Sequence, residues 1–193
     1  MVPSIETCFR LMRQYKMLEN IRVHSVVVAK IAHLIATGLK KKCSAISIEK
    51  TTAAALMHDI GKTASLRSGE DHAEVGRQIC LKNRLDDIAQ IVGEHVRLKD
   101  DQISQDCSEK EIVFYSDKRV NHDKVVTLEE RLDYILRRYG GNNEGLRRRI
   151  IANFDVCKRV EKKLFCRLDF TPEGLQELVD RDDGFLGMIE KVK

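Results

Sequence analysis

Several histidine and aspartate side chains lie on the apolar faces of predicted helices. At about 3.6 residues per turn, His24 shares a face with the apolar residues 4, 7 and 11 positions after it. His95 follows apolar residues at spacings of 7, 4 and 3, and Asp117 lies four residues after one valine and three before another. The adjacent pair His58-Asp59 lies near the end of a further predicted helix. We therefore expect these imidazoles and carboxylates to point into the core.

Burying such groups is costly unless they have partners, because an uncompensated imidazole or carboxylate loses its hydration. A lone core histidine is most simply a hydrogen-bonded structural residue. Side chains from several helices that converge on a metal explain the whole set together. His33 lies half a turn away from the face of His24, and His122 lies in a short predicted loop, so we expect neither of them to bind metal.

The elements that must position these groups are predicted to be helices. The chain has only 2 prolines, no tryptophan and 5% aromatic residues, so helix breakers and strand-favouring residues are few. The composition therefore indicates an all-α fold. Capping-box spacings mark three helix starts, at Asp71/Glu74, Ser108/Glu111 and Thr127/Glu130. Helices are predicted over 21–39 and 47–61 and around 88–95, and from starts near His72, Glu109, Leu128, Asn143 and Thr171, with the Leu128 helix running to Gly140.

Size and charge narrow the class of protein. A chain of 193 residues predicts one domain, and no apolar run approaches the ~20 residues that a bilayer requires. The net charge of +4 is too small for an obligate nucleic-acid binder, and the basic residues between 147 and 163 are interleaved with acidic ones. Six widely separated cysteines and the absence of a leader in the first ten residues lead us to expect reduced thiols and a cytoplasmic protein.

The order of the motifs resembles the HD-domain superfamily of metal-dependent phosphohydrolases, of the HDIG type. His24 is followed by His58-Asp59 within the segment 57–62, and then by Asp117 within 115–119. The segments 71–74 and 93–96 resemble the extra histidine motifs of the subset with a two-metal site. The resemblance implies a helical bundle. We expect residues 1–193 to form a single HD-type domain, with the motif core over about 20–140 and a C-terminal helical extension over 141–193.

The resemblance also implies a binuclear centre of divalent transition-metal ions. One ion would be held by His24, His58, Asp59 and Asp117, and Asp59 would bridge to a second ion held by His72 and His95. Nitrogen-rich ligands suit iron, manganese, zinc, cobalt or nickel better than magnesium. Iron or manganese is the first expectation from the resemblance. If a single ion binds, His72 and His95 would act on the substrate instead.

This sequence departs from many two-metal relatives in two places. Valine follows His95 where those relatives have a second histidine, and the glycine-tyrosine-proline signature of HD-GYP domains is absent. These departures argue against cleavage of cyclic dinucleotides of the HD-GYP type.

A phosphate ester is the substrate that such a centre is expected to attract. Two divalent cations outweigh two aspartates and a bridging hydroxide, so the centre remains positive, and metal binding makes hydroxide available at neutral pH. Attack by that hydroxide would hydrolyse a phosphate mono- or diester, most simply of a nucleotide, with Asp59 and Lys62 as the catalytic residues. We expect Lys62, Lys118 and Arg97 to bind the substrate phosphate, although each could instead be a solvated cation.

Two other functions fit the same motifs. One is a dinucleoside polyphosphate hydrolase, and the other is a non-catalytic nucleotide-binding HD signalling module. The partner expected in each case is a small molecule, and the chain could also form a homodimer. Metal content distinguishes the enzyme from the module, because modules generally have degraded metal motifs whereas all six ligand positions are present here.

Overall fold

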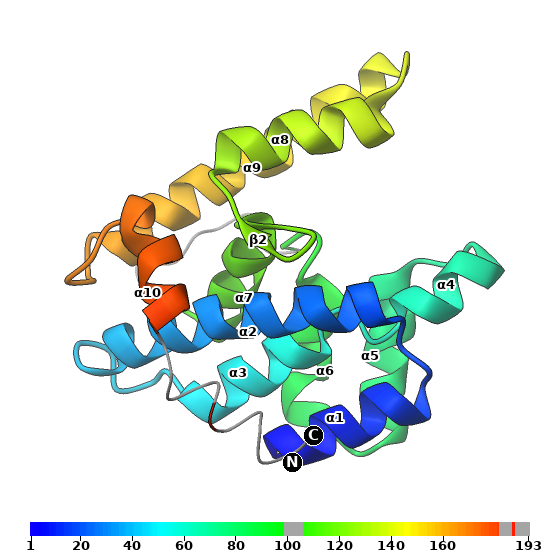
Figure 1. Cartoon of the computed structure of the whole chain (residues 1–193), viewed down its shortest axis with the longest axis horizontal. Helices are drawn as coiled ribbons and strands as arrows, with labels where there is room; N and C mark the ends of the chain where they lie inside the picture. The colour runs from blue at the N-terminus through cyan, green and yellow to red at the C-terminus, as the bar shows by residue number, and fades with distance from the viewer. Residues whose placement is uncertain (99–105, 182–186, 188–193) are drawn as a thin grey trace.

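A computed structural model describes residues 1–98, 106–181 and 187 of the chain. Within these ranges the chain is a set of packed helices (Figure 1), and the only strands are the two short ones of a β-hairpin, with two residues each. The all-α prediction is confirmed. The elements are α1 (Ile5–Gln14), α2 (Glu19–Lys40), α3 (Ile48–Met57), α4 (Lys62–Ser68), α5 (His72–Lys82), α6 (Asp86–Glu94), α7 (Glu109–Lys118), β1 (Val120–Asn121), β2 (Lys124–Val125), α8 (Leu128–Ile135), the π-helical turn η1 (Leu136–Gly140), α9 (Glu144–Phe165), the 3-10 turn η2 (Pro172–Gly174) and α10 (Leu175–Arg181).

The long helix α2 lies at the centre of the fold and packs against α3, α7 and α10. Its buried face includes Val28, Ile31 and Ile35, the stripe predicted to surround His24. In the described part of the chain, α2 alone has the length and mean hydropathy of a membrane span, but half of that window is buried inside the protein. Its apolar residues thus pack against other helices of the fold.

Most helix starts follow the predicted capping chemistry. Ser108 and Thr127 form complete capping boxes with the glutamate three residues later. At Asp71 the box is incomplete: the carboxylate accepts from the backbone N–H of Ala73, and Glu74 instead accepts hydrogen bonds from two side chains in the next turn. Glu74 thus accepts charge-assisted hydrogen bonds from Arg77 instead of a hydrogen bond from the backbone N–H of the N-cap residue.

Several boundaries differ from the prediction. The helix predicted to continue to Gly61 ends at Met57, and α4 begins at Lys62 after a turn. The helix α1 and the helix α4 were not predicted, and the loop around His122 contains the hairpin β1–β2. The helix that begins at Leu128 changes to π-helical geometry after Ile135 instead of continuing regularly to Gly140. Part of the predicted C-terminal extension, 182–186 and 188–193, lies outside the described residues.

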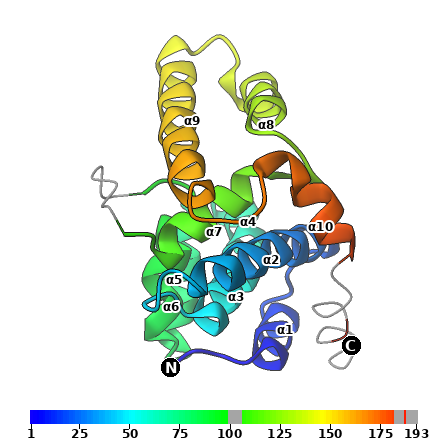
Figure 2. The ribbon, with the colours of Figure 1, turned by 90° about the vertical axis from the view of Figure 1, so that its left-hand side faces the viewer.

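The helices α8 and α9 lie side by side and run in opposite directions (Figure 1), and they project from the core (Figure 2). The second half of α9 is attached to α7 by polar contacts that are largely buried. Lys163 donates to both carboxylate oxygens of Glu111, and Glu161 accepts from Tyr115 and Arg119. Arg119, which is itself buried, also donates to the carbonyl of Pro172. This network fixes the end of α7 beside the predicted site.

The turn after α3 requires a glycine at position 61. A Cβ on Gly61 would lie 2.5 Å from the backbone N and 3.1 Å from the Cα of Gly76 in α5, and closer still to the carbonyl oxygen of His72. Gly76 has a similar constraint, since a Cβ there would lie 2.9 Å from Val92. The two glycines therefore let the start of α5, which carries His72, approach the His58-Asp59 turn.

We predict that Gly61→Ala lowers the free energy of unfolding by about 1–3 kcal/mol, because the added methyl group meets backbone atoms that cannot move independently. Urea unfolding measures this change. Gly174→Ala is the matched control, because a Cβ at Gly174 meets no atom within 4 Å. Equal stability of the two variants would contradict the close-approach explanation.

Candidate metal centre

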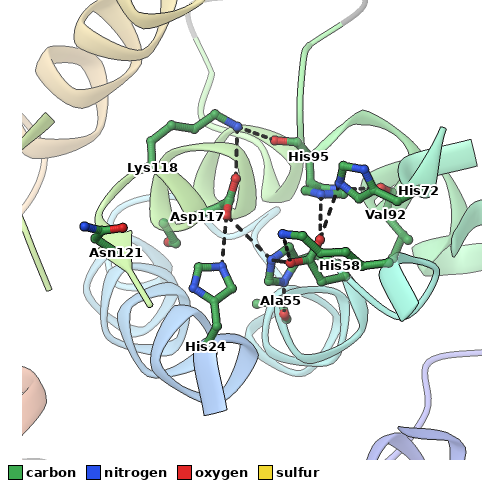
Figure 3. Close-up of polar contacts among 12 residues, drawn as sticks. His24, Ala55, His58, His72, Val92, His95, Asp117, Lys118 and Asn121 are labelled. Carbon is green, nitrogen blue, oxygen red and sulfur yellow. Dashed lines mark hydrogen bonds and ion pairs between the residues drawn. The ribbon is translucent and has the colours of Figure 1, made fainter. Parts of the chain in front are cut away.

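The structure brings together six histidine and aspartate side chains from five regions of the fold (Figure 3). They come from the first turns of α2, the turn after α3, the start of α5, the C-terminal end of α6 and the last turn of α7. All are buried except His72 and Asp117, which are partly exposed. The six residues are His24, His58, Asp59, His72, His95 and Asp117.

Three of the imidazoles are oriented by backbone carbonyl groups. The Nδ1 atoms of His58 and His95 lie 2.7 and 2.6 Å from the carbonyl oxygens of Ala55 and Val92, one turn earlier on their own helices. The Nδ1 atom of His24 lies 3.0 Å from the carbonyl oxygen of a loop residue, position 122. A carbonyl oxygen can only accept, so each Nδ1 carries the proton. Their Nε2 atoms are then left to face the carboxylates, as is usual for metal-binding histidines.

The Nε2 atoms meet carboxylate oxygens that also lack protons. His24 Nε2 lies 3.1 Å from Asp117 Oδ1, and His95 Nε2 lies 3.5 Å from Asp59 Oδ1. A neutral imidazole has one N–H, so a ring that donates from Nδ1 presents a lone pair to the carboxylate. His58 Nε2 and Asp59 Oδ1 are fully buried and have no hydrogen-bond partner among the described residues. A cation between these atoms would bind the lone pairs that face one another and would give the two buried atoms a partner.

The two oxygens of Asp59 face different histidines. Oδ2 lies 3.5 Å from His58 Nε2, whereas Oδ1 lies 3.4 and 3.5 Å from the Nε2 atoms of His72 and His95. Two groups therefore share this carboxylate, one with His24 and His58 and the other with His72 and His95, and within each group the ligand atoms lie within 4.8 Å of one another. The residues present thus fit two transition-metal ions on either side of Asp59.

The electrostatics of the site keep the carboxylates charged. Burial raises the pKa of Asp59, but His58, His95 and Lys62 outweigh it and hold the pKa well below its usual range. Burial likewise acts against ionisation of Asp117, and its pKa is also lowered, chiefly by Lys118. Both side chains are therefore carboxylates at neutral pH.

The pKa values of three imidazoles, those of His58, His72 and His95, are shifted in two directions. Burial lowers the pKa of His72 to about 4 and also lowers the pKa of His95, so both rings are neutral and able to bind metal at pH 7. At His58 burial also acts against the charged form, but Asp59 and Asp117 outweigh it and raise the pKa. His58 is therefore the ring at which protons compete most strongly with a metal.

The predicted phosphate-binding cations occupy three different positions. Lys62 lies on the floor of the site, with Nζ 2.8 Å from Asp59 Oδ2, and lines the hollow above it. Lys118 also lines that hollow, but its Nζ donates to the His95 carbonyl at 2.6 Å and to Asp117 at 3.2 Å. Arg97 lies apart, in a smaller hollow with Arg149. The structure therefore places Lys62 at the site and Arg97 outside it. Lys118 lies beside the site, but protein groups already accept hydrogen bonds from its ammonium group.

The histidines that we did not expect to bind metal lie outside the six-residue cluster. His33 Nδ1 lies 3.1 Å from the Thr52 hydroxyl, between α2 and α3. The ring of His122 packs against Tyr134, and only its backbone carbonyl contacts the cluster, through His24.

Sequence reasoning missed the wall of the site that α8 and η1 provide. Arg131 and Tyr139 line the hollow above Asp59 and also a second hollow beside His24. The sequence did contain a pattern that indicates this wall, because positions 131, 134/135 and 138/139 are three or four residues apart and so share one helical face. Nothing in that spacing indicates which neighbour the face meets.

Comparison with known proteins now agrees with this geometry. The family described as HD domain matches residues 21–157, which is most of the chain and contains all six side chains. The chain belongs to the HD domain family. HD domains are metal-dependent hydrolases as a superfamily, and the paired histidine and aspartate groups of this HD domain fit that chemistry.

Two curated relatives are similar to this HD domain. One is the uncharacterized protein MJ0778 of Methanocaldococcus jannaschii, 24% identical over 72% of this chain and 88% of its own length. The other is ribonuclease Y of Treponema denticola, 27% identical over 77% of this chain but only 31% of that protein. The chain thus spans about a third of the ribonuclease. No solved structure matches significantly.

We predict that metal content falls in steps when ligands are removed. The wild-type protein should bind about two transition-metal ions, His24→Ala and His72→Ala about one each, and Asp59→Ala none, because Asp59 is common to both groups. Elemental analysis after manganese loading measures this. His33→Ala is the control and should retain both ions. Equal loss of both ions in His24→Ala and His72→Ala would contradict two separable groups.

We also predict that metal affinity rises with pH. A proton on His58 Nε2 blocks the lone pair, so affinity should fall as the pH drops through the raised pKa of His58 and should level off above it. Calorimetric titration with Mn²⁺ between about pH 5.5 and 8, in buffers of different ionisation enthalpy, measures both affinity and proton release. Constant affinity with no proton released would contradict this description of the site.

Proposed function

We propose that this HD domain is a metal-dependent phosphohydrolase that cleaves a phosphate ester of a nucleotide. The observation that carries the proposal is the position of Asp59, a buried carboxylate shared by two histidine groups at the floor of an open hollow. That hollow has a volume of about 440 Å³, which is within the range of small-molecule sites.

The six side chains would hold two divalent ions, with iron or manganese preferred. When bound, two such ions supply Lewis acidity and lower the pKa of water from ~15.7 towards ~7, which makes a nucleophile available at neutral pH. Asp59 would contribute one oxygen to each ion, since its two oxygens already face the two groups. Three of the histidines keep their Nδ1 protons on backbone carbonyls and present Nε2 inward.

The other residues of the site bind and orient the substrate. Lys62 would donate to a non-bridging phosphate oxygen, because its ammonium group lies at the floor of the hollow and its side chain is 39% exposed. Lys118 acts as a positioning residue: it donates to Asp117 and to the carbonyl at the end of α6, so it ties together two elements that carry ligands. The walls of the hollow include Phe154 and Ile150.

The reaction that these groups support is hydrolysis at phosphorus. The oxygen of water forms a new P–O bond, the P–O bond to the leaving group breaks, and one proton of the water passes to the departing alcohol. The similarity to ribonuclease Y, whose name denotes cleavage of RNA, supports a nucleotide-containing substrate. The net charge of +4 and the paired charges along α9 favour a small molecule over a long nucleic acid, in a cytoplasmic setting.

We predict that the manganese- or iron-loaded protein hydrolyses a nucleotide phosphate ester, and that Asp59→Asn lowers the rate by at least about 100-fold through loss of the shared carboxylate. Phosphate or nucleoside release across nucleoside mono-, di- and cyclic phosphates and dinucleotides measures this. Asp133→Asn on the exposed face of α8 is the control and should retain full activity. Nucleotide binding without turnover in the loaded wild type would instead indicate a non-catalytic binding module.

A further inference from the structure

The site of this HD domain opens into two hollows rather than one. The first, of about 440 Å³, includes His72 and His95, and the second, of about 300 Å³, includes His24. Asp59 and Lys62 line both hollows. A phosphate placed at Asp59 therefore has room for one substituent on the α5–α6 side and another on the α2 side.

The side chains that separate the two hollows come mainly from α4 and from the α8–η1 segment. Arg131, Leu66 and Tyr139 line both, and the last two are exposed apolar or aromatic side chains, at 69% and 60%. Such rims suit flat, partly apolar groups, because aromatic side chains stack on nucleobases. Each hollow thus has the Asp59 carboxylate at its floor and the exposed side chains of Leu66 and Tyr139 in its lining.

Arg131 differs from the two lysines that line the first hollow. Lys62 is paired with Asp59 and Lys118 with Asp117. Among residues 1–98, 106–181 and 187, no carboxylate forms an ion pair with Arg131, whose Nη1 donates to the neutral amide oxygen of Asn121 at 3.0 Å. Its Nε atom is fully buried and has no hydrogen-bond partner in this part of the chain. A guanidinium without an anion at the junction of two hollows is available for a phosphate oxygen.

We propose that Arg131 binds a non-bridging oxygen of a phosphodiester whose two ester substituents occupy the two hollows. This inference rests on the proposed function and narrows its substrate class from phosphate esters in general to diesters. Water adds to phosphorus, one P–O ester bond breaks, and the products are a phosphate monoester and an alcohol that carries one proton of the water.

The first test compares two chromogenic substrates, bis(p-nitrophenyl) phosphate and p-nitrophenyl phosphate, with the manganese-loaded protein. We expect kcat/KM for the diester to exceed kcat/KM for the monoester by about tenfold or more. Arg131→Gln should lower kcat/KM for the diester by about tenfold or more with metal content unchanged. Arg131→Lys should recover part of the lost activity, because a lysine ammonium keeps the positive charge but lacks the paired N–H donors of the planar guanidinium. Arg137→Gln is the matched control, since Arg137 is exposed and paired with Asp133; it should match the wild type.

The second test narrows one hollow at a time. Asn20, an exposed residue of α2, lines only the second hollow, and Ile150 of α9 lines only the first. Asn20→Trp and Ile150→Trp should each lower the ratio of diester to monoester hydrolysis by about fivefold or more. A wild-type preference for the monoester, or an unchanged ratio in both variants, would overturn the inference while leaving the proposed phosphohydrolase intact.

A binding measurement separates failure of the inference from failure of the proposed function. If the loaded wild type hydrolyses neither chromogenic substrate and none of the nucleotides, the proposed function fails, and calorimetric binding of bis(p-nitrophenyl) phosphate decides the role of Arg131. Binding weakened by about tenfold in Arg131→Gln but not in Arg137→Gln supports the assignment. Equal affinity of the wild type and both variants overturns it.

Discussion

The buried carboxylate of Asp59 is the constraint on which the rest of the structure depends. It is 1% exposed, it remains ionised, and three imidazole Nε2 atoms lie within 3.5 Å of its oxygens. Neutral rings that donate from Nδ1 to backbone carbonyls cannot also donate to it, so Lys62 is the one permanent cation in contact with it among the described residues. A buried anion surrounded by lone pairs is stable only if cations are supplied. The cluster therefore fits a metal centre better than a structural polar core.

The scaffold supplies the cluster from elements far apart in the sequence. The turn after α3 places His58 and Asp59 side by side, and the contact of Gly61 with α5 brings His72 to the same carboxylate. At the end of α7, Lys118 and Arg119 fix Asp117 by opposite means: the first bonds to the end of α6, and the second to Glu161 and the C-terminal segment. The α8–α9 pair lines part of the first hollow, and none of the six clustered side chains comes from that pair.

Helical phase and motif order predicted that these six side chains come together, because both depend on local properties. His24 and His95 lie on apolar helix faces, which fold against the core. Ser108 and Thr127 cap helices by hydrogen bonds to the residue three positions later. The turn at Gly61 was missed, because the need for glycine arises from a contact with α5 that no local pattern encodes. For the same reason no local pattern pointed to Arg131, which lines both hollows, or showed that Arg97 lines a different hollow from Asp59. A basic side chain next to a ligand in sequence can point elsewhere, whereas one from a distant helix can complete the site.

The central claim is that Asp59 joins two metal sites, and anomalous diffraction from crystals of the manganese-loaded protein tests it most directly. We expect two anomalous peaks in contact with the Asp59 carboxylate, one beside His24 and His58 and the other beside His72 and His95. A single peak that leaves one histidine group empty at saturating metal, or peaks that lie away from Asp59, would contradict it.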